Sequence, residues 1–497
     1  MPYPENSKIK WQPYSQETFD KARLDLRPIL LYISASWSRE CRAYERETLE
    51  SDDISKNLNR HLIPIWVDSD RRSDLFAKYG AFNPPTTVFM DFNGNEIARF
   101  DGVQNRSFLM SVMEKAASGK LSQTPKFAPI DERKPSKFTE KNVLEFLSDY
   151  DSHLAYQFDE LYGGFGMAEK FPSTYALDYL AVQYMLHGKN LWKKALEKSL
   201  AGLENLQDPI EGGFFRYSDR RDFGLPHYEK MLNVNAAIAD IYLKAGKVFQ
   251  NDHYISIAKK NLEWMEKTLL DATEGGFFGS QASDEHFYLS SAEDRKKQKA
   301  PAVDRTKYCD WNAQAVVCFL HAHRILSDLK YWEIADGALE FMEKSLISEN
   351  GAMHFAQEEK KGSLDGCLLD NAWTAVAFLE AYRIGKQESH LKIGKSILKY
   401  MVGELYSEEK GAFMESKSSS TSMLLKSDLE SNRILHHGNA IACWALITDF
   451  ICTQNPNSLE ILKKVASNFL YVHDDLNTTA LFAQIAGNLM EKAPTGK

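Results

Sequence analysis

The sequence has few cysteines, and no two of them have a redox or metal-binding spacing. Its 497 residues contain six cysteines, and none forms a Cys-x-x-Cys pair. Scattered thiols in a long chain indicate reduced cysteines of an intracellular protein, not a disulfide framework. The sequence also contains no His-Glu-x-x-His motif, cysteine–histidine cluster or phosphate-binding glycine loop. We therefore expect no metal ion and no cofactor.

Long apolar runs and an excess of basic charge are also missing. No window approaches 18 uncharged apolar residues, so we expect no membrane-spanning segment, and the polar residues 1–10 do not resemble a signal peptide. The net charge is −9, which argues against nucleic-acid binding because nucleic-acid binders normally present a basic face. The densest basic cluster, residues 295–299, is expected to be a solvated loop. These absences predict a cytoplasmic protein with no nucleic-acid or membrane partner.

The first quarter of the chain alternates apolar runs with helical patterns. Short apolar runs and an Asn93-Gly94-Asn95 turn predict strands joined by helices and closed by a hairpin. The predicted strands are residues 28–35, 62–68, 86–92 and 96–102. This order predicts an α/β domain over residues 1–120.

Two local motifs sharpen the interpretation of this domain. The first strand leads into Trp37-Ser38-Arg39-Glu40-Cys41, and Pro84-Pro85 precedes the third strand. The segment thereby resembles the thioredoxin fold, which has Trp-Cys-x-x-Cys at this junction and a cis-proline facing it. The resemblance matches Ser38 and Cys41 to the two cysteines and Pro85 to the cis-proline. A serine hydroxyl cannot carry out thiol–disulfide exchange. We expect a redox-inactive domain that serves as a scaffold or docks a protein partner, with a single-thiol role for Cys41 as the alternative.

Residues 121–137 contain three prolines among charged residues and predict an interdomain linker. Two kinds of helix then alternate over residues 138–497. One kind is small and apolar nearly all round, which predicts burial on every side, and each such helix is followed by one with a single apolar stripe. The apolar segments with the clearest mutual similarity begin at Asn235, Asn312, Asn371 and Asn439. Twelve helices in this order predict an inner ring within an outer ring, an all-α (α/α)6 toroid.

The connections between these helices are unequal in length. Turns from inner to outer helices are short, whereas the connections back are long. The long connections therefore meet at one rim, at the N-terminal ends of the inner helices. Long loops in compact domains are usually functional, and converging helix N-termini favour polar or anionic ligands. Related glycine-aromatic motifs recur in four of them: Gly163-Gly164-Phe165, Gly212-Gly213-Phe214-Phe215, Gly275-Gly276-Phe277-Phe278 and Gly411-Ala412-Phe413.

Residues 226–236 (PHYEKMLNVNA) closely resemble the P-H-F-E-K-M-L-x-x-N-A motif of the thioredoxin-domain-containing family typified by spermatogenesis-associated protein 20. Further landmarks of that family follow in the same order at residues 162–172, 211–218, 274–284, 304–313 and 436–440. The chain lacks the family's Cys-x-x-Cys and Gly-Gly-Trp-Pro segments, so the resemblance does not extend to thiol chemistry. It implies a helical half like the N-acylglucosamine 2-epimerase and six-hairpin glycosidase toroids, and hence a small carbohydrate as ligand.

We expect the functional residues at the loop-bearing rim. The candidates for catalysis are His227, Glu229, His437, Asp370 and Asp222. The candidates for substrate contacts are Phe165, Glu169, Phe215, Tyr217, Phe278, Asp310, Trp311, Asn312, Trp373 and His436.

Two reactions and one non-catalytic role fit these candidates. Histidine titrates near neutrality and suits the proton transfers of epimerisation or isomerisation. Glycoside hydrolysis needs two carboxylates, which Glu229 with Asp222 or Asp370 would supply. The third hypothesis is a non-catalytic module that binds a ligand or protein partner. Structural roles compete with each candidate, because Asp310 and Asp370 could be helix N-caps and the aromatic residues could fill the core.

Overall fold

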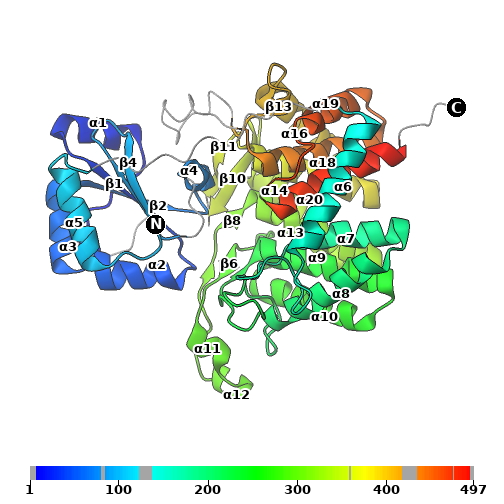
Figure 1. Ribbon diagram of the computed structural model, residues 1–497, viewed down its shortest axis with the longest axis horizontal. Helices are drawn as coiled ribbons and strands as arrows, with labels where there is room; N and C mark the ends of the chain where they lie inside the picture. The colour runs from blue at the N-terminus through cyan, green and yellow to red at the C-terminus, as the bar shows by residue number, and fades with distance from the viewer. Residues whose placement is uncertain are drawn as a thin grey trace. The chain divides into compact units, whose positions relative to one another are not determined.

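The computed structural model describes residues 7–79, 84–121, 137–357, 360–416, 434–473 and 475–492. The chain divides into two compact units, which contain residues 7–121 and nearly all the described residues from 137 onward. The first unit is drawn in blue in Figure 1. Apart from its ends, the expected linker over 121–137 lies outside the described residues, so the domain boundaries stay a prediction.

The first unit is a four-stranded sheet between two layers of helices. Its strands follow the order β2-β1-β3-β4, with β1 parallel to β2 and antiparallel to β3. The strands are β1 (Ile29–Ser34), β2 (Ile63–Asp68), β3 (Thr86–Met90) and β4 (Glu96–Asp101), and the helices are α1 (Gln16–Asp25), α2 (Arg39–Tyr44), η1 (Glu45–Leu49), α3 (Asp52–His61), α4 (Ser73–Lys78) and α5 (Arg106–Ala117). All four predicted strands are confirmed.

Alternating side chains of β1 build both layers of this core. Leu30 and Tyr32 pack with residues of α3 and α5, whereas Leu31 and Ile33 pack with residues of α1 and α4. Every residue of β1 is buried, because successive side chains of a strand point to opposite faces and both faces are covered. The apolar run that predicted this strand therefore follows from its central place in the sheet.

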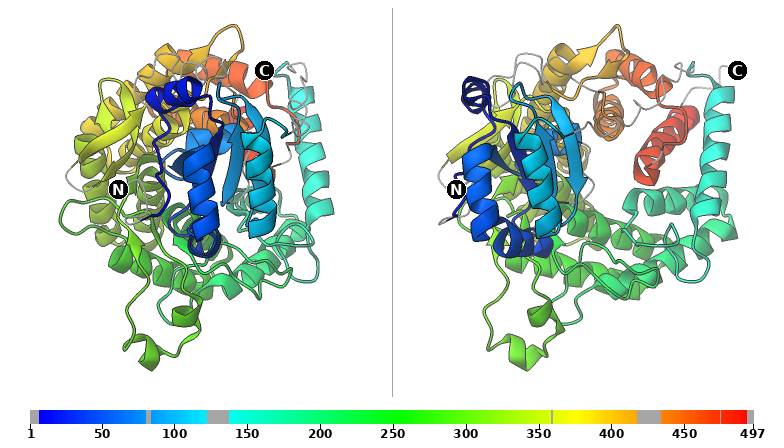
Figure 2. Two further views of the ribbon diagram at one scale, coloured as in Figure 1. Left: turned by 90° about the vertical axis from the view of Figure 1, so that its left-hand side faces the viewer. Right: turned by 60° about the vertical axis from the view of Figure 1, so that its left-hand side comes forward.

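Twelve helices of the described second unit form two concentric rings. The inner helices are α7 (Thr174–His187), α9 (Leu232–Phe249), α13 (Cys309–Leu326), α15 (Leu368–Gly385), α18 (His436–Thr453) and α20 (Leu476–Lys492). Each inner helix packs against the next, and α20 closes the ring on α7. The right-hand view of Figure 2 shows this ring. The predicted (α/α)6 toroid is confirmed.

The outer helices each pair with one inner helix. They are α8 (Asn190–Leu203), α10 (Asp252–Thr268), α14 (Leu329–Ser345), α16 (Glu388–Tyr400), α19 (Pro456–Ser467) and α6 (Glu140–Gln157). The buried residues of α10 recur at intervals of three and four, as expected for a helix with one covered face. The first helix of the domain, α6, packs on the last, α20, so the sixth hairpin joins the two ends of the domain.

Left-handed residues make the short turns from inner to outer helices. Gly188, Gln250, Ser327, Lys386 and Gln454 each follow an inner helix with a positive φ. A left-handed residue ends a helix by satisfying its last carbonyl groups. The outer helix begins within the next few residues.

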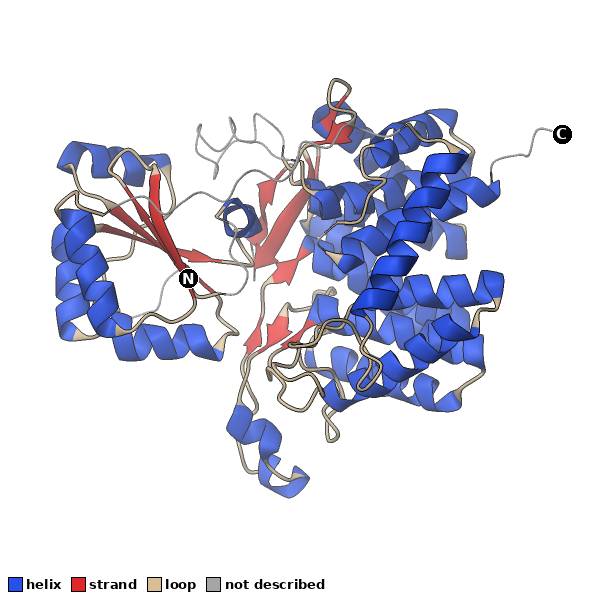
Figure 3. Cartoon of the chain, viewed as in Figure 1, coloured by secondary structure: helices blue, strands red, loops and turns tan. Residues whose placement is uncertain are grey.

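The long connections carry short strands and helices, which Figure 3 distinguishes by colour. Three small sheets have the orders β5-β6-β7, β11-β10-β8 with β9 on β10, and β12-β13. The strands of these sheets are β5 (Lys230–Met231), β6 (Ser280–Gln281), β7 (Val303–Asp304), β8 (Lys307–Tyr308), β9 (Ile347–Ser348), β10 (Gly351–Gln357), β11 (Lys360–Asp365), β12 (Tyr406–Ser407) and β13 (Ala412–Phe413). The short helices outside the two rings are α11 (Glu285–Leu289), α12 (Ala292–Arg295), η2 (Glu204–Leu206) and η3 (Met401–Leu405). Among the described helices, none combines the length and apolarity needed to cross a bilayer.

Ring closure generates a test of the second unit. We expect residues 138–497, produced alone, to give a helical circular dichroism spectrum and one cooperative thermal transition, because every inner helix keeps both neighbours. A shorter protein ending at residue 473 removes α20 and leaves α7 and α18 each without one neighbour. It should lose the cooperative transition. A cooperative transition retained in the shorter protein would contradict closure through α20.

Candidate functional site

A buried asparagine near the start of an inner helix fastens the rim loop before it. Asn235 Nδ2 donates to the carbonyl oxygens of Phe214 at 3.0 Å and Met231 at 2.8 Å, and its Oδ1 accepts from the Phe214 N–H. The side chain is fully buried. One amide therefore ties the glycine-aromatic loop to helix α9.

The same contact recurs at the other three repeated asparagines. Asn312 holds Phe277, Asn439 holds Phe413, and Asn371 accepts from the N–H of Ala352. The remaining Asn312 hydrogen bond goes to the carbonyl oxygen of Tyr308. The buried amide of Asn312 is therefore used on the backbone, which favours a structural role over the expected contact with substrate.

Buried aspartate–lysine pairs fix the same loops. Asp208 stands four residues before Gly212, and its carboxylate lies 2.8 Å from Lys230 Nζ, which also donates to the Gly212 carbonyl oxygen. Asp208 accepts from Arg295 at 2.8 Å as well. Arg295 is buried, so the expectation of a wholly solvated basic loop at 295–299 is wrong at this residue.

Equivalent pairs recur in two neighbouring loops. Lys170 binds Asp159 at 2.9 Å, and Lys307 binds Asp271 at 2.8 Å. Lys230, the lysine of the 226–236 motif, thus has two counterparts, Lys170 and Lys307, and each of the three lysines holds a rim loop by pairing with a buried aspartate. Each ammonium replaces the hydration that its buried aspartate loses.

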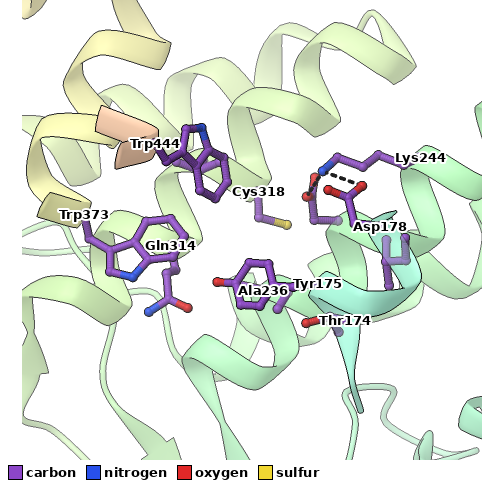
Figure 4. A pocket seen from close by; sticks show the side chains of 13 residues that line it. Thr174, Tyr175, Asp178, Ala236, Lys244, Gln314, Cys318, Trp373 and Trp444 are labelled. Carbon is purple, nitrogen blue, oxygen red and sulfur yellow. Dashed lines mark ion pairs between the residues drawn. The ribbon is translucent and has the colours of Figure 1, made fainter. Parts of the chain in front are cut away.

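The inner ring surrounds a partly open cavity. Five inner helices line it, namely α7, α9, α13, α15 and α18. Figure 4 shows Trp373 and Trp444 on one side and Lys244 with Asp178 on the other. The two tryptophan rings lie 5.3 Å apart at 64°. Tyr175 and Gln314 also line the space.

The charged wall of the cavity is an ion-pair network. Lys244 Nζ lies 3.0 Å from Asp178 Oδ1 and 2.9 Å from Asp240 Oδ2. His321 Nδ1 lies 2.7 Å from the other Asp240 oxygen. Burial works against the charge on Lys244, but the two carboxylates raise its pKa. The cavity therefore presents a fixed ammonium beside fixed carboxylates.

A second group of buried polar side chains joins two inner helices and a rim strand. Asp310 lies in the first turn of α13, Asp370 in the first turn of α15, and His354 on β10. His354 Nδ1 lies 3.0 and 2.9 Å from the two Asp370 oxygens. Burial, with the charge of Asp370, raises the pKa of Asp310 to about 7.

The capping alternative for these two aspartates is wrong. The N-caps of α13 and α15 are Tyr308 and Cys367, and neither helix has a side-chain cap hydrogen bond. Asp310 and Asp370 lie inside their helices and face each other instead. We refer to Asp310, His354 and Asp370 as the Asp–His–Asp cluster.

The Asp–His–Asp cluster lies at the rim end of the cavity. Gln314 follows Asp310 by four residues and Trp373 follows Asp370 by three, which places each pair on one helix face. Gln314 and Trp373 both line the cavity. Burial raises the pKa of the cavity-lining Tyr175, and the charge of Asp310 contributes to this effect.

His227 and Glu229 lie together in a different part of the rim. The His227 ring stacks on Tyr217 at 4.1 Å and 16°, and its Nδ1 lies 3.9 Å from Glu229 Oε1. Nε2 contacts Asp219 at 2.9 Å. Burial raises the pKa of Glu229. Asp222 pairs with a nearby arginine in an exposed turn of the same loop.

His437 lies beside the cavity and not beside His227. Its ring is 6.1 Å from that of Tyr175, and its Nδ1 is 3.4 Å from Thr478 Oγ1. Burial lowers the pKa of His437, and Asp475 opposes that effect. Within the described chain, no ring contact, hydrogen bond or ion pair joins His437 to His227 or Glu229. The expected catalytic residues therefore fall into three separate groups.

The remaining candidates take mostly structural positions. Trp373 lines the cavity as described, and Trp311 rests on Tyr308 at 4.6 Å. His436 faces His473 at 4.5 Å, and Glu169 is exposed in its loop. The other aromatic candidates are buried in the core, namely Phe165, Phe215, Tyr217 and Phe278.

Several cavity residues were missed in the sequence. Asp178, Asp240 and Lys244 are charged residues inside otherwise apolar inner helices, and that pattern was a usable signal because a charge there must find a buried partner. Trp444 carries no such signal. His354 belongs to a rim strand, and nothing local distinguishes it from a surface histidine.

The thioredoxin-like site takes the expected positions. Ser38 caps α2 by accepting from the Cys41 N–H at 3.2 Å. The Pro84–Pro85 bond is cis. Cys41 is fully buried, and burial raises the pKa of its thiol to about 11. The thiolate is the reactive form, so this geometry favours the redox-inactive hypothesis.

A thioredoxin-like unit followed by an (α/α)6 toroid defines the class of this protein. Residues 3–88 match the family model Thioredox_DsbH, described as a protein of unknown function, DUF255. Mouse (Mus musculus) spermatogenesis-associated protein 20 is 27% identical over 56% of this chain and 39% of its own length. An uncharacterized protein of Caenorhabditis elegans is 26% identical over 56% of this chain and 42% of its own. The resemblance inferred from residues 226–236 is thus confirmed, although the match spans only about two fifths of the length of these relatives.

Solved structures share the fold of the toroid. A D-mannose isomerase matches with a TM-score of 0.57 at 11% identity, over 72% of this chain and 100% of that one. A sugar epimerase from a ruminal bacterium gives 0.55 at 14% identity, over 69% and 98%. A family 76 glycoside hydrolase from Bacteroides thetaiotaomicron gives 0.53 at 10% identity, over 82% and 84%. At these identities the likeness concerns fold alone.

The asparagine contacts predict a structural phenotype. Asn235→Ala should lower the free energy of unfolding by about 2–4 kcal/mol, because it leaves buried Phe214 backbone groups without partners. Asn190→Ala, at an exposed position of α8, should change it by less than about 0.5 kcal/mol. Urea unfolding followed by circular dichroism measures both variants. Equal stabilities of the two variants would refute the loop-fastening role.

Proposed function

We propose that the toroid binds a sugar in its central cavity and catalyses its epimerisation or isomerisation. The observation that carries the proposal is the pair Trp373 and Trp444 opposite Lys244 and Asp178. Aromatic faces suit the apolar C–H face of a pyranose, and a few fixed polar groups suit its hydroxyls.

The polar wall supports a ligand rich in hydroxyl groups. A hydroxyl both donates and accepts, so adjacent hydroxyls can bind an ammonium and a carboxylate at once. Lys244 and Asp178 lie 3.0 Å apart and offer that combination to two neighbouring sugar oxygens. Gln314 adds an amide with both a donor and an acceptor. The fold shared with a D-mannose isomerase and a sugar epimerase agrees with this ligand class.

His437 supports proton transfer as the reaction. Epimerisation or isomerisation needs a base that is neutral near pH 7, and burial lowers the pKa of His437 below its ordinary value. The ring adjoins Tyr175, which lines the cavity. Hydrolysis through Asp178 and Asp240 is disfavoured, because the bound Lys244 keeps both as acceptors and leaves neither as a proton donor.

Sugar binding is testable with a panel of glucose, mannose, N-acetylglucosamine, cellobiose and mannobiose. We expect at least one to bind by isothermal titration, and Trp444→Ala to weaken that binding about tenfold or more, since loss of ring stacking costs about 1.4 kcal/mol. Trp332→Ala is the matched control, because Trp332 packs on the outer side against Gly385. Equal affinity in both variants, or no binding by the wild type, would count against the proposal.

The chemistry is testable with the sugar that binds. In deuterated water we expect deuterium incorporation at sugar C2, detected by NMR, and its loss in His437→Gln with binding retained. The rate should hold down to about pH 6.5 and fall below it, because the base is lost only when the imidazole gains a proton. Release of new reducing ends without exchange would instead identify a hydrolase.

A further inference from the structure

Asp310, His354 and Asp370 come from three separate elements and converge on one buried point. One ligand-type atom from each lies within 4.8 Å of the others. All three side chains are buried, and His354 Nδ1 lies 2.9 Å from Asp370 Oδ2. We propose that this Asp–His–Asp cluster binds a divalent transition-metal ion, Zn²⁺ or Mn²⁺, at the rim end of the toroid cavity.

An oxygen without a partner supports the proposal. Asp310 is 6% exposed, and its Oδ1 accepts no hydrogen bond from the described residues. A buried carboxylate oxygen left without a partner is costly. This oxygen belongs to a side chain of the cluster, so a cation bound by that carboxylate would supply the missing interaction.

Other buried aspartates of the toroid show what is different here. Asp159, Asp208 and Asp271 each hold a lysine at 2.8–2.9 Å. Asp370 is paired with His354, and Asp310 lies beside them; among the described residues, no ion pair joins either carboxylate to a lysine or arginine. A divalent ion would neutralise both carboxylates, as a lysine does for the aspartate in each of these three loops.

The donor set indicates the kind of ion. One imidazole nitrogen and two carboxylate oxygens form a mixed set, and imidazole favours Zn²⁺ and similar metals over Mg²⁺ and Ca²⁺. Three protein ligands leave coordination positions open, which is typical of catalytic and not structural sites. Gln314 and Trp373 lie one helical turn from Asp310 and Asp370 and line the cavity, so an ion bound by the cluster would lie next to the cavity. Metal binding itself does not depend on the proposed sugar function.

Metal uptake by the full-length chain tests this inference without any sugar. After treatment with EDTA and dialysis, Zn²⁺ or Mn²⁺ is titrated by isothermal calorimetry, and bound metal is counted by elemental mass spectrometry. We expect one ion per chain with a micromolar or tighter dissociation constant. Asp310→Asn and His354→Ala should weaken it at least 30-fold. Asp449→Asn should not, since Asp449 is buried elsewhere and bound to Ser458 at 2.6 Å.

If His354→Ala folds poorly, the melting temperatures of the wild type and of Asp310→Asn, with and without metal, still test the proposal. Asp310→Asn conserves shape and removes one buried charge, so its metal-free melting temperature should equal or exceed that of the wild type. The metal should raise the melting temperature of the wild type and leave that of Asp310→Asn unchanged. No ion bound by the wild type at 1 mM Zn²⁺ or Mn²⁺ (a concentration about a thousandfold above a micromolar dissociation constant) would overturn the proposal. Equal affinity of Asp310→Asn would do the same.

Discussion

The helical half of this protein depends on the contact between its last inner helix and its first helices. An inner helix that is apolar nearly all round is stable only with a neighbour on every side. Helices α7 and α18 each have α20 as their second neighbour in the inner ring, because α20 packs on both. The outer side of α20 is covered by α6, from the other end of the domain. The ring therefore forms only when segments more than 300 residues apart meet, which makes the toroid one cooperative unit and not a row of independent hairpins.

Closure of the ring also brings polar side chains from different elements together at the rim. Because the rim loops start from neighbouring helix ends, side chains from α13, α15 and a rim strand reach one point. The loops are held by asparagine amides and by aspartate–lysine pairs, all desolvated and all paired. Against this background of satisfied groups, charge is concentrated inside the ring at the Asp–His–Asp cluster and at the ion-pair wall of the cavity.

Most of the fold was predictable because its signals are local. Strand runs, the alternation of all-apolar with striped helices and the recurring glycine motifs each lie within a few residues of one another. The function of the repeated residues was harder to predict. Asn312 and Lys230 belong to motifs that look like a site, yet they hold loops in place. In contrast, His354 joins Asp310 and Asp370 only through the register of β10 beside two helices, and no local pattern contains that information.

The two sides of the toroid differ in how much sequence change they can absorb. On one side, single left-handed residues turn five of the inner helices directly into their outer partners, so an insertion there would displace two packed helices. On the other side, each rim loop is anchored at its base, and the chain beyond the anchor can lengthen at small entropic cost, since loop closure depends only weakly on length. The anchors thereby separate heritable variation in the rim loops from the stability of the ring, and a lineage can change its rim without rebuilding its core.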